Sequence, residues 1–123
     1  MTSKQYFIAT TDGKVEVKGY PVVIPGYEQF SFFAHHTYYK RYLNDSCESH
    51  FRKDWQISEA TTGFGCMPSS WAGGMSNNTR AGALTIVIED FKSKNREYVL
   101  QILKTAIEGA QGGIYDRAFQ LWW

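Results

Sequence analysis

The sequence predicts an α+β fold: an antiparallel sheet of about four strands, followed by two main helices packed on one face and a short C-terminal helix. Strand-like segments fill the first half of the chain, and segments with helical spacing of apolar residues fill the second half. A parallel nucleotide-binding sheet would instead alternate strand and helix. With 123 residues, we expect a single domain spanning residues 1–123.

The strands are predicted from apolar and polar residues that alternate with a period of two. This alternation places strands over residues 5–10, 14–24, 30–38 and 55–61. Asp12-Gly13 and Pro25-Gly26 are turn dipeptides that separate the first three strands. Gly19 should mark a bend or a bulge in the second strand.

Two stretches show neither the strand period of two nor the helical spacing of apolar residues. Residues 39–54 are polar, charged and aromatic, and residues 63–78 are rich in glycine. Both are predicted to be long loops or insertions, and loops of this length are often functional.

Helical spacing begins at Thr79 and predicts helices over residues 79–92 and 96–109. Asn77 or Asn78 is the expected N-cap of the first helix, and Gly109 is a plausible end of the second. The residues expected in the core are Ile8, Val17, Phe32, Ile57, Leu84, Ile88, Val99, Ile102 and Leu103.

The charge is nearly balanced: Lys and Arg number 13, Asp and Glu number 12, and the formal net charge is +1. General nucleic-acid binding usually needs a basic excess, so it is not expected. No stretch approaches the roughly 20 apolar residues of a membrane span, and the polar start does not resemble a signal peptide. We therefore expect no membrane partner and a cytoplasmic location, with Cys47 and Cys66 as free thiols.

The first candidate site is the glycine-rich approach to the first helix, with Trp71, Gly73, Gly74, Asn78 and Arg80. Unpaired N–H groups at a helix N-terminus attract anions, and an arginine there can hold a phosphate or carboxylate with two donors. The spacing matches neither the Walker A motif nor the dinucleotide fingerprint. The commoner interpretation of such a stretch is an ordinary loop that ends in an Asn cap.

The second candidate site is an aromatic and basic segment that includes His36, Tyr38, Tyr39 and Arg41. Interleaved rings and cations suit base stacking combined with phosphate contact. Nearby acidic residues cancel most of the charge, and the alternative is a strand end whose rings pack on the domain or on a partner chain.

Metal binding and catalysis receive less support. Cys47, His50 and Cys66, with His35 or His36, are residue types that bind zinc, but no paired second motif accompanies them. No local signature marks a cysteine nucleophile. We therefore predict no metal, no cofactor and no catalytic residue, and we lean against an enzyme.

The last residues are apolar: Leu121, Trp122 and Trp123. Three large apolar side chains should not remain exposed together. They could cap the protein's own core or join a neighbouring subunit, because aromatic residues are favoured at the centre of interfaces. The second reading predicts a homo-oligomer.

A longer pattern runs over roughly residues 4–108. Its parts are Gly19-Tyr20-Pro21-Val22-Val23-Ile24-Pro25-Gly26-Tyr27, then Phe32-Phe33-Ala34-His35, Trp55-Gln56-Ile57-Ser58-Glu59-Ala60-Thr61-Thr62-Gly63 and Thr79-Arg80. This pattern resembles the short uncharacterised proteins encoded by bacteriophages and prophages. The resemblance implies an accessory protein in a bacterial host cell and supplies no catalytic residues. Many such proteins block host factors, as anti-CRISPR proteins do, or sequester nucleotide signals of host defence.

The leading hypothesis is therefore a non-enzymatic phage or mobile-element accessory protein of the anti-defence type. It would occupy or sequester a host component, which is either a host protein or a nucleotide-type ligand. The alternative is a small-ligand or nucleotide-binding protein, which could be an enzyme, that uses the helix start at residues 73–80 and the segment 36–41.

Overall fold

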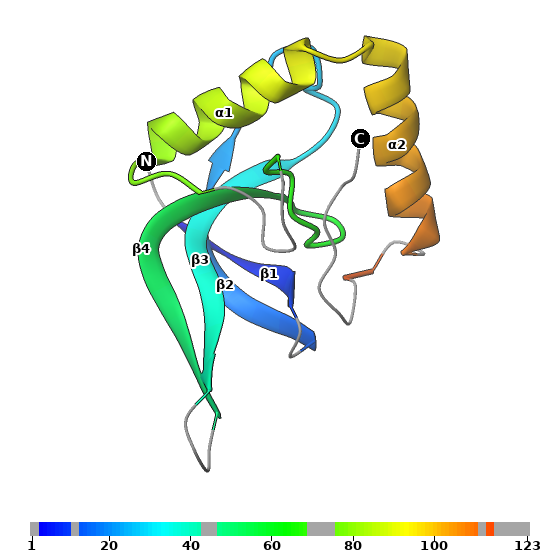
Figure 1. Ribbon diagram of the computed structural model, residues 1–123. Coiled ribbons are helices and arrows are strands. Elements are labelled where there is room, and N and C mark those ends of the chain that lie inside the picture. The colour runs from blue at the N-terminus through cyan, green and yellow to red at the C-terminus, as the bar shows by residue number, and fades with distance from the viewer. Residues whose placement is uncertain (1–2, 11–12, 43–46, 69–75, 111–112, 115–123) are drawn as a thin grey trace.

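The computed structural model describes residues 3–10, 13–42, 47–68, 76–110 and 113–114, and for residues 39–42 and 47–50 it describes the backbone alone. The elements are β1 (Lys4–Thr10), β2 (Gly13–Val22), β3 (Phe32–Tyr42), β4 (Cys47–Glu59), α1 (Arg80–Lys92) and α2 (Arg96–Gly109). The strands form one sheet in the order β1-β2-β3-β4 with antiparallel neighbours, and the helices follow it (Figure 1). This arrangement confirms the predicted α+β class, while the predicted C-terminal helix falls outside the described residues.

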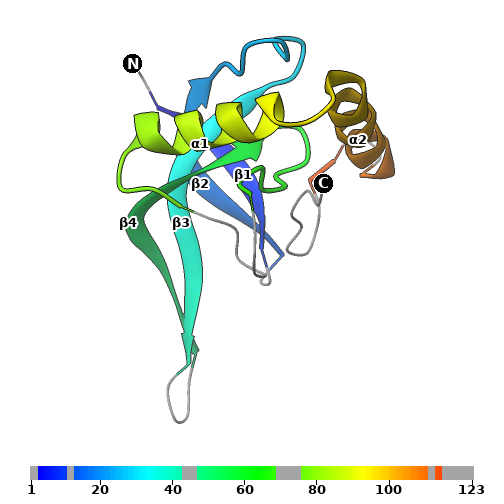
Figure 2. The ribbon, with the colours of Figure 1, turned by 45° about the horizontal axis from the view of Figure 1, so that its top comes forward.

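The third and fourth strands extend much further than the sequence predicted. Their register continues from Tyr38 opposite Phe51 to Tyr42 opposite Cys47, which makes a two-stranded ribbon. This ribbon runs away from the helices (Figure 2). The prediction of a loop over residues 39–54 was therefore wrong for most of that stretch. A ribbon that leaves the core has no single buried face to impose apolar–polar alternation, so the period of two is missing from its sequence.

Strand β2 changes partner along its length. Residues 13–19 pair with β1, and residues 20–22 pair with β3. Gly19 lies at this change, beneath the stacked rings of Tyr6 and Phe33, whose centroids are 4.1 Å apart. A Cβ atom on Gly19 would lie 2.6 Å from Phe33 Cδ2 and 2.7 Å from Tyr6 Cδ2. The predicted irregularity at Gly19 is thus a place where only glycine lets two rings close over the backbone.

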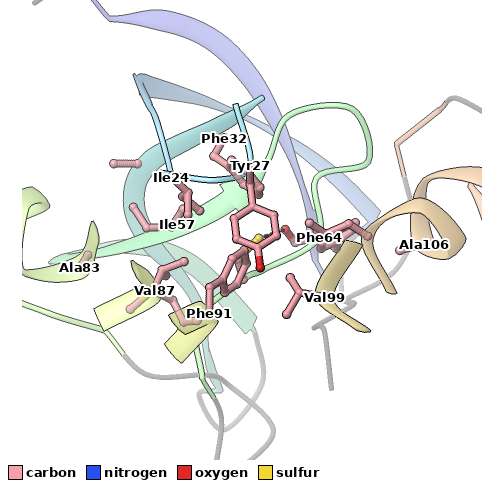
Figure 3. Packing of buried hydrophobic residues seen from close by; sticks show 14 residues of the cluster. Ile24, Tyr27, Phe32, Ile57, Phe64, Ala83, Val87, Phe91, Val99 and Ala106 are labelled. Carbon is pink, nitrogen blue, oxygen red and sulfur yellow. Dashed lines mark hydrogen bonds between the residues drawn. The ribbon is translucent and has the colours of Figure 1, made fainter. Parts of the chain in front are cut away.

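Both helices pack against one hydrophobic cluster (Figure 3). Helix α1 lies across β3 and β4, and α2 follows beside it (Figures 1 and 2). The helical side chains that are buried there are Ala83, Val87, Phe91, Val99, Leu103 and Ala106. The cluster also holds Phe64, Cys66 and Met67 from the segment after β4.

Most of the predicted core is confirmed, since Ile8, Val17, Phe32, Ile57, Val99 and Leu103 are buried. Leu84, Ile88 and Ile102 are only partly buried and pack at the margin of the cluster. The centre of the buried face of α1 is the row of Ala83, Val87 and Phe91 at four-residue steps. Ala83 is buried but small, so a search for large apolar residues overlooks it.

A second, smaller cluster consists of Ile8, Val17 and Phe33, with Tyr38 among the partly buried residues around it. At the end of β4, the buried carboxylate of Glu59 accepts hydrogen bonds from the Thr61 N–H (2.6 Å) and the Thr62 N–H (3.0 Å). These bonds close the turn that brings the following segment back onto the core.

The helix caps and one turn have clear causes. Thr79 is the N-cap of α1, and its Oγ1 accepts from the Gly82 N–H at 2.9 Å. The predicted caps Asn77 and Asn78 were wrong, because Asn77 instead accepts from the Thr79 N–H at 3.0 Å and so orients the true cap. The predicted Pro25-Gly26 turn is confirmed by a φ of 90° at Gly26. In the described part of the chain, neither helix has the length and apolar character to cross a bilayer.

Candidate functional site

Four partly exposed side chains meet around Trp55 of β4 and form what we call the Trp55 cluster: Tyr20, His36, Trp55 and Arg80. The His36 and Trp55 ring centroids are 4.0 Å apart, and the Tyr20 ring meets Trp55 edge-on at 5.8 Å. The guanidinium carbon of Arg80 lies 3.9 Å from the Tyr20 ring centroid and 5.4 Å from that of Trp55. Cation–π and ring contacts therefore hold one continuous aromatic and cationic surface.

Backbone pairing brings these residues together. His36 lies opposite Trp55 in the β3–β4 register. The Trp55 N–H donates to the Asn77 carbonyl at 2.6 Å, and the Asn77 N–H donates to the Trp55 carbonyl at 3.1 Å. This bridge holds the chain against β4 just before α1 begins, so Arg80, the first residue of α1, reaches the rings. The two candidate segments of the sequence therefore meet at Trp55.

His36 has a fixed orientation. Its Nδ1 lies 3.2 Å from the Lys53 carbonyl, and since a carbonyl can only accept, Nδ1 carries the proton. Nε2 is then the other hydrogen-bonding atom of the ring. The ring is held both by this bond and by Trp55, so it is ordered before any ligand arrives.

Arg80 occupies an electrostatically unusual position. The first turn of α1 contains no acidic residue, so the guanidinium adds to the positive end of the helix dipole instead of neutralising it. Contact with the Tyr20 ring offsets part of this repulsion. Nη1 of Arg80 is buried and has no hydrogen-bond partner in the part of the chain that the structure describes. Such a donor favours an anionic acceptor.

A pocket of about 290 Å³ adjoins the cluster, and its lining includes Glu16, Val17, Lys18, His36 and Phe51. It lies where β2 separates from β3 and continues with β1, at the change of partner between residues 19 and 20. The divergence of the two strand pairs is visible in Figure 1. The pocket is thus a consequence of the sheet topology.

Phe51 forms part of the pocket wall and is 50% exposed. Its ring meets Tyr38 edge-on, with centroids 5.4 Å apart. Sequence reasoning did not select Phe51, because it lies in the stretch wrongly predicted to be a loop. Trp55 was also missed, since it was interpreted as the start of a strand. Large aromatic residues among charged neighbours were the available signal for both.

The remaining predicted site residues have mixed outcomes. Tyr38 packs beside the smaller cluster, and Asn78 is exposed. Tyr39 and Arg41 belong to β3, but their side chains lie outside the described parts of the structure. Six other predicted site residues lie entirely outside the described parts of the structure: Trp71, Gly73, Gly74, Leu121, Trp122 and Trp123.

A buried histidine–serine pair lies on β3 and β4. The His35 Nδ1–H donates to the His36 carbonyl at 2.8 Å, so Nε2, 2.7 Å from Ser58 Oγ, accepts from that hydroxyl. Burial lowers the pKa of His35 to about 4. The geometry is that of a nucleophile and its base, but both residues are buried and no substrate can reach them as the chain is folded here.

Some of the residues considered as zinc ligands are engaged elsewhere in the fold. Cys66 lies in the core, where burial and the nearby Glu59 carboxylate raise the pKa of its thiol. His35 is engaged by Ser58, and the side chains of Cys47 and His50 are not described. Among the described residues, no three His, Cys, Asp or Glu side chains are grouped so as to hold a metal ion.

Comparison of the chain with protein-family models, curated proteins and solved structures finds no match. The functional argument therefore rests on the site itself.

Proposed function

We propose that the protein is a non-enzymatic binding protein of phage or mobile-element origin that occupies or sequesters a component of a bacterial host cell. Its recognition surface is the Trp55 cluster with the adjoining pocket. The observation that carries this proposal is that residues distant in the sequence, His36 and Arg80, converge on one partly exposed tryptophan.

The chemistry of the cluster favours recognition. Tryptophan, tyrosine and arginine dominate binding energies because they offer large contact areas and directional polar groups. The His36–Lys53 hydrogen bond and the bridge between Trp55 and Asn77 order the surface in advance, which lowers the entropy lost on binding. The histidine–serine pair that could have suggested hydrolysis is buried, which supports a binding role over a catalytic one.

The proposal is tested by capture from a bacterial host lysate with the tagged protein and its variants. Arg80→Ala and His36→Ala should each reduce the captured component about tenfold or more, as expected for side chains at the centre of a recognition surface. Tyr98→Ala is the matched control, since Tyr98 is an aromatic residue that is 46% exposed on α2, a helix that contributes no residue to the Trp55 cluster. Thermal unfolding of each variant should stay close to that of the wild type.

A second experiment extends the test to the segments predicted from sequence. A variant with Tyr38, Tyr39, Arg41, Trp71 and Arg80 all replaced by alanine should not capture the component. Full capture by this variant would refute the assignment of the surface. Conversion of the captured component to a new product by the wild type would refute the non-enzymatic role.

The pocket favours a second candidate, a small-ligand or nucleotide-binding protein. Its volume of about 290 Å³ is near the lower end of the range found for small-molecule sites. The two candidates agree if the sequestered component is itself a small molecule.

A further inference from the structure

The pocket between β2 and β3 has two chemically different walls. Glu16 and Lys18 of β2 supply a carboxylate and an ammonium group, while His36 of β3 and Phe51 of β4 supply rings. A pocket of about 290 Å³ has room for one small ring system. The walls therefore select a compact, planar and polar ligand.

The ring wall is suited to stacking. Phe51 is half exposed, and its edge-on contact with Tyr38 fixes its orientation. Any nucleobase can stack on such a ring, because every base has a planar π-face. His36 presents Nε2 as a hydrogen-bonding atom, because Nδ1 is committed to Lys53. The Glu16 carboxylate can accept a hydrogen bond from an exocyclic amino group.

Lys18 gives the pocket a cationic group that an anionic part of a ligand can contact. Lys18 lies in the wall, and Tyr20, two residues further along β2, contacts the guanidinium of Arg80. Alternate residues of a strand lie on the same face, so Lys18 and Tyr20 project to one side of β2. In the described lining Lys18 and Glu16 carry opposite charges, and the Arg80 guanidinium lies outside this lining, against Tyr20.

We infer that this pocket binds a nucleotide-type ligand, with a base carrying an exocyclic amino group between Phe51 and Glu16, and a phosphate group toward Lys18. The inference rests on the proposed function and deepens it, since it names the chemical class of the sequestered component. No chemical step is involved.

Isothermal titration calorimetry of the full chain with AMP, CMP, IMP and UMP tests the inference. Phe51→Ala should weaken the binding of AMP and CMP about fivefold or more, whereas Phe51→Trp should preserve it. Lys18→Ala should also weaken binding about fivefold. Glu16→Gln should reduce the preference for AMP over IMP and for CMP over UMP. Tyr98→Ala and Lys104→Ala are controls on exposed positions of α2 and should bind as the wild type does.

Two results would overturn the inference: no binding of any of these nucleotides at roughly 1 mM, or binding that Phe51→Ala and Lys18→Ala leave unchanged. Failure of the inference is distinguishable from failure of the proposed function. If no nucleotide binds but Arg80→Ala abolishes capture of a host protein, the inference is wrong and the proposed function stands. If a nucleotide binds through these residues and is converted to a product, the inference stands and the non-enzymatic function is wrong.

Discussion

Acidification should destabilise the fold through His35, which is buried against Ser58. Removal from water disfavours the charged ring and lowers its pKa from 6.5 to about 4. The unfolded chain binds a proton near pH 6.5, whereas the folded chain resists protonation until about pH 4. The stabilising contribution of neutral His35 is thus fully present above pH 6.5 and is lost as the pH falls to about 4. This shift corresponds to about 3 kcal/mol in the free energy of unfolding.

The measurement is urea denaturation at several pH values between 7 and 4, for the wild type and for His35→Gln. Carboxylates titrate over part of the same range in both proteins, so the difference between the two curves isolates the histidine. The Gln variant should be less stable at pH 7, because it cannot reproduce both hydrogen bonds of the ring. Its disadvantage should shrink by about 3 kcal/mol on acidification to pH 4.

Parallel pH profiles for the two proteins would refute this reasoning. So would a nuclear magnetic resonance titration in which the His35 ring protons change shift with a midpoint near 6.5 in the folded state. Either result would mean that water reaches the ring, and the pair with Ser58 would then need to be reconsidered as a reactive site.

Three further outcomes are expected. Gly19→Ala should lower the free energy of unfolding by about 1–3 kcal/mol, because the new methyl group would collide with the rings of Tyr6 and Phe33; unchanged stability in urea denaturation would show that the rings can move apart. Cys66 should resist thiol reagents in the folded protein, because burial and the Glu59 carboxylate raise the pKa of its thiol. Rapid labelling of Cys66 under native conditions would contradict this expectation. Deletion of residues 119–123 should convert an oligomer to monomers or aggregates, as measured by light scattering. The reason is that burial of a tryptophan at an interface typically contributes about 2 kcal/mol or more to binding. An unchanged mass would contradict the proposed role of these residues.

The parts of the fold that were predicted correctly are those in which burial imposes a period on the sequence. Strands β1 and β2 and both helices show such a period, and their bounds agree with prediction to within about two residues. The β3–β4 ribbon extends away from the helices (Figure 2), and nothing in its local sequence records the cross-strand pairing. The buried face of α1 was misjudged because it begins at Ala83, and small residues carry little weight in a hydrophobic pattern.

The sequence predicted which residue types form the site but not how the fold brings them together. His36 and Arg80 were selected as residue types that suit anion and ring binding, and both are in the cluster. That they share Trp55 depends on the bridge between Trp55 and Asn77, a tertiary contact with no local signal. The pocket depends in the same way on the change of partner of β2.

The change of partner of β2 from β1 to β3 affects both stability and recognition, but different side chains are responsible for each. Gly19 lets the rings of Tyr6 and Phe33 close over β2 at the point where it leaves β3, so this contact holds the divergence in place. Phe51 and Lys18 line the resulting opening and are exposed, so their removal costs the fold little. A substitution beneath the rings should therefore impair folding and binding together, whereas substitutions in the pocket wall should impair binding alone. Loss of stability in Phe51→Ala equal to that in Gly19→Ala would show that the pocket wall is part of the core and not a recognition surface.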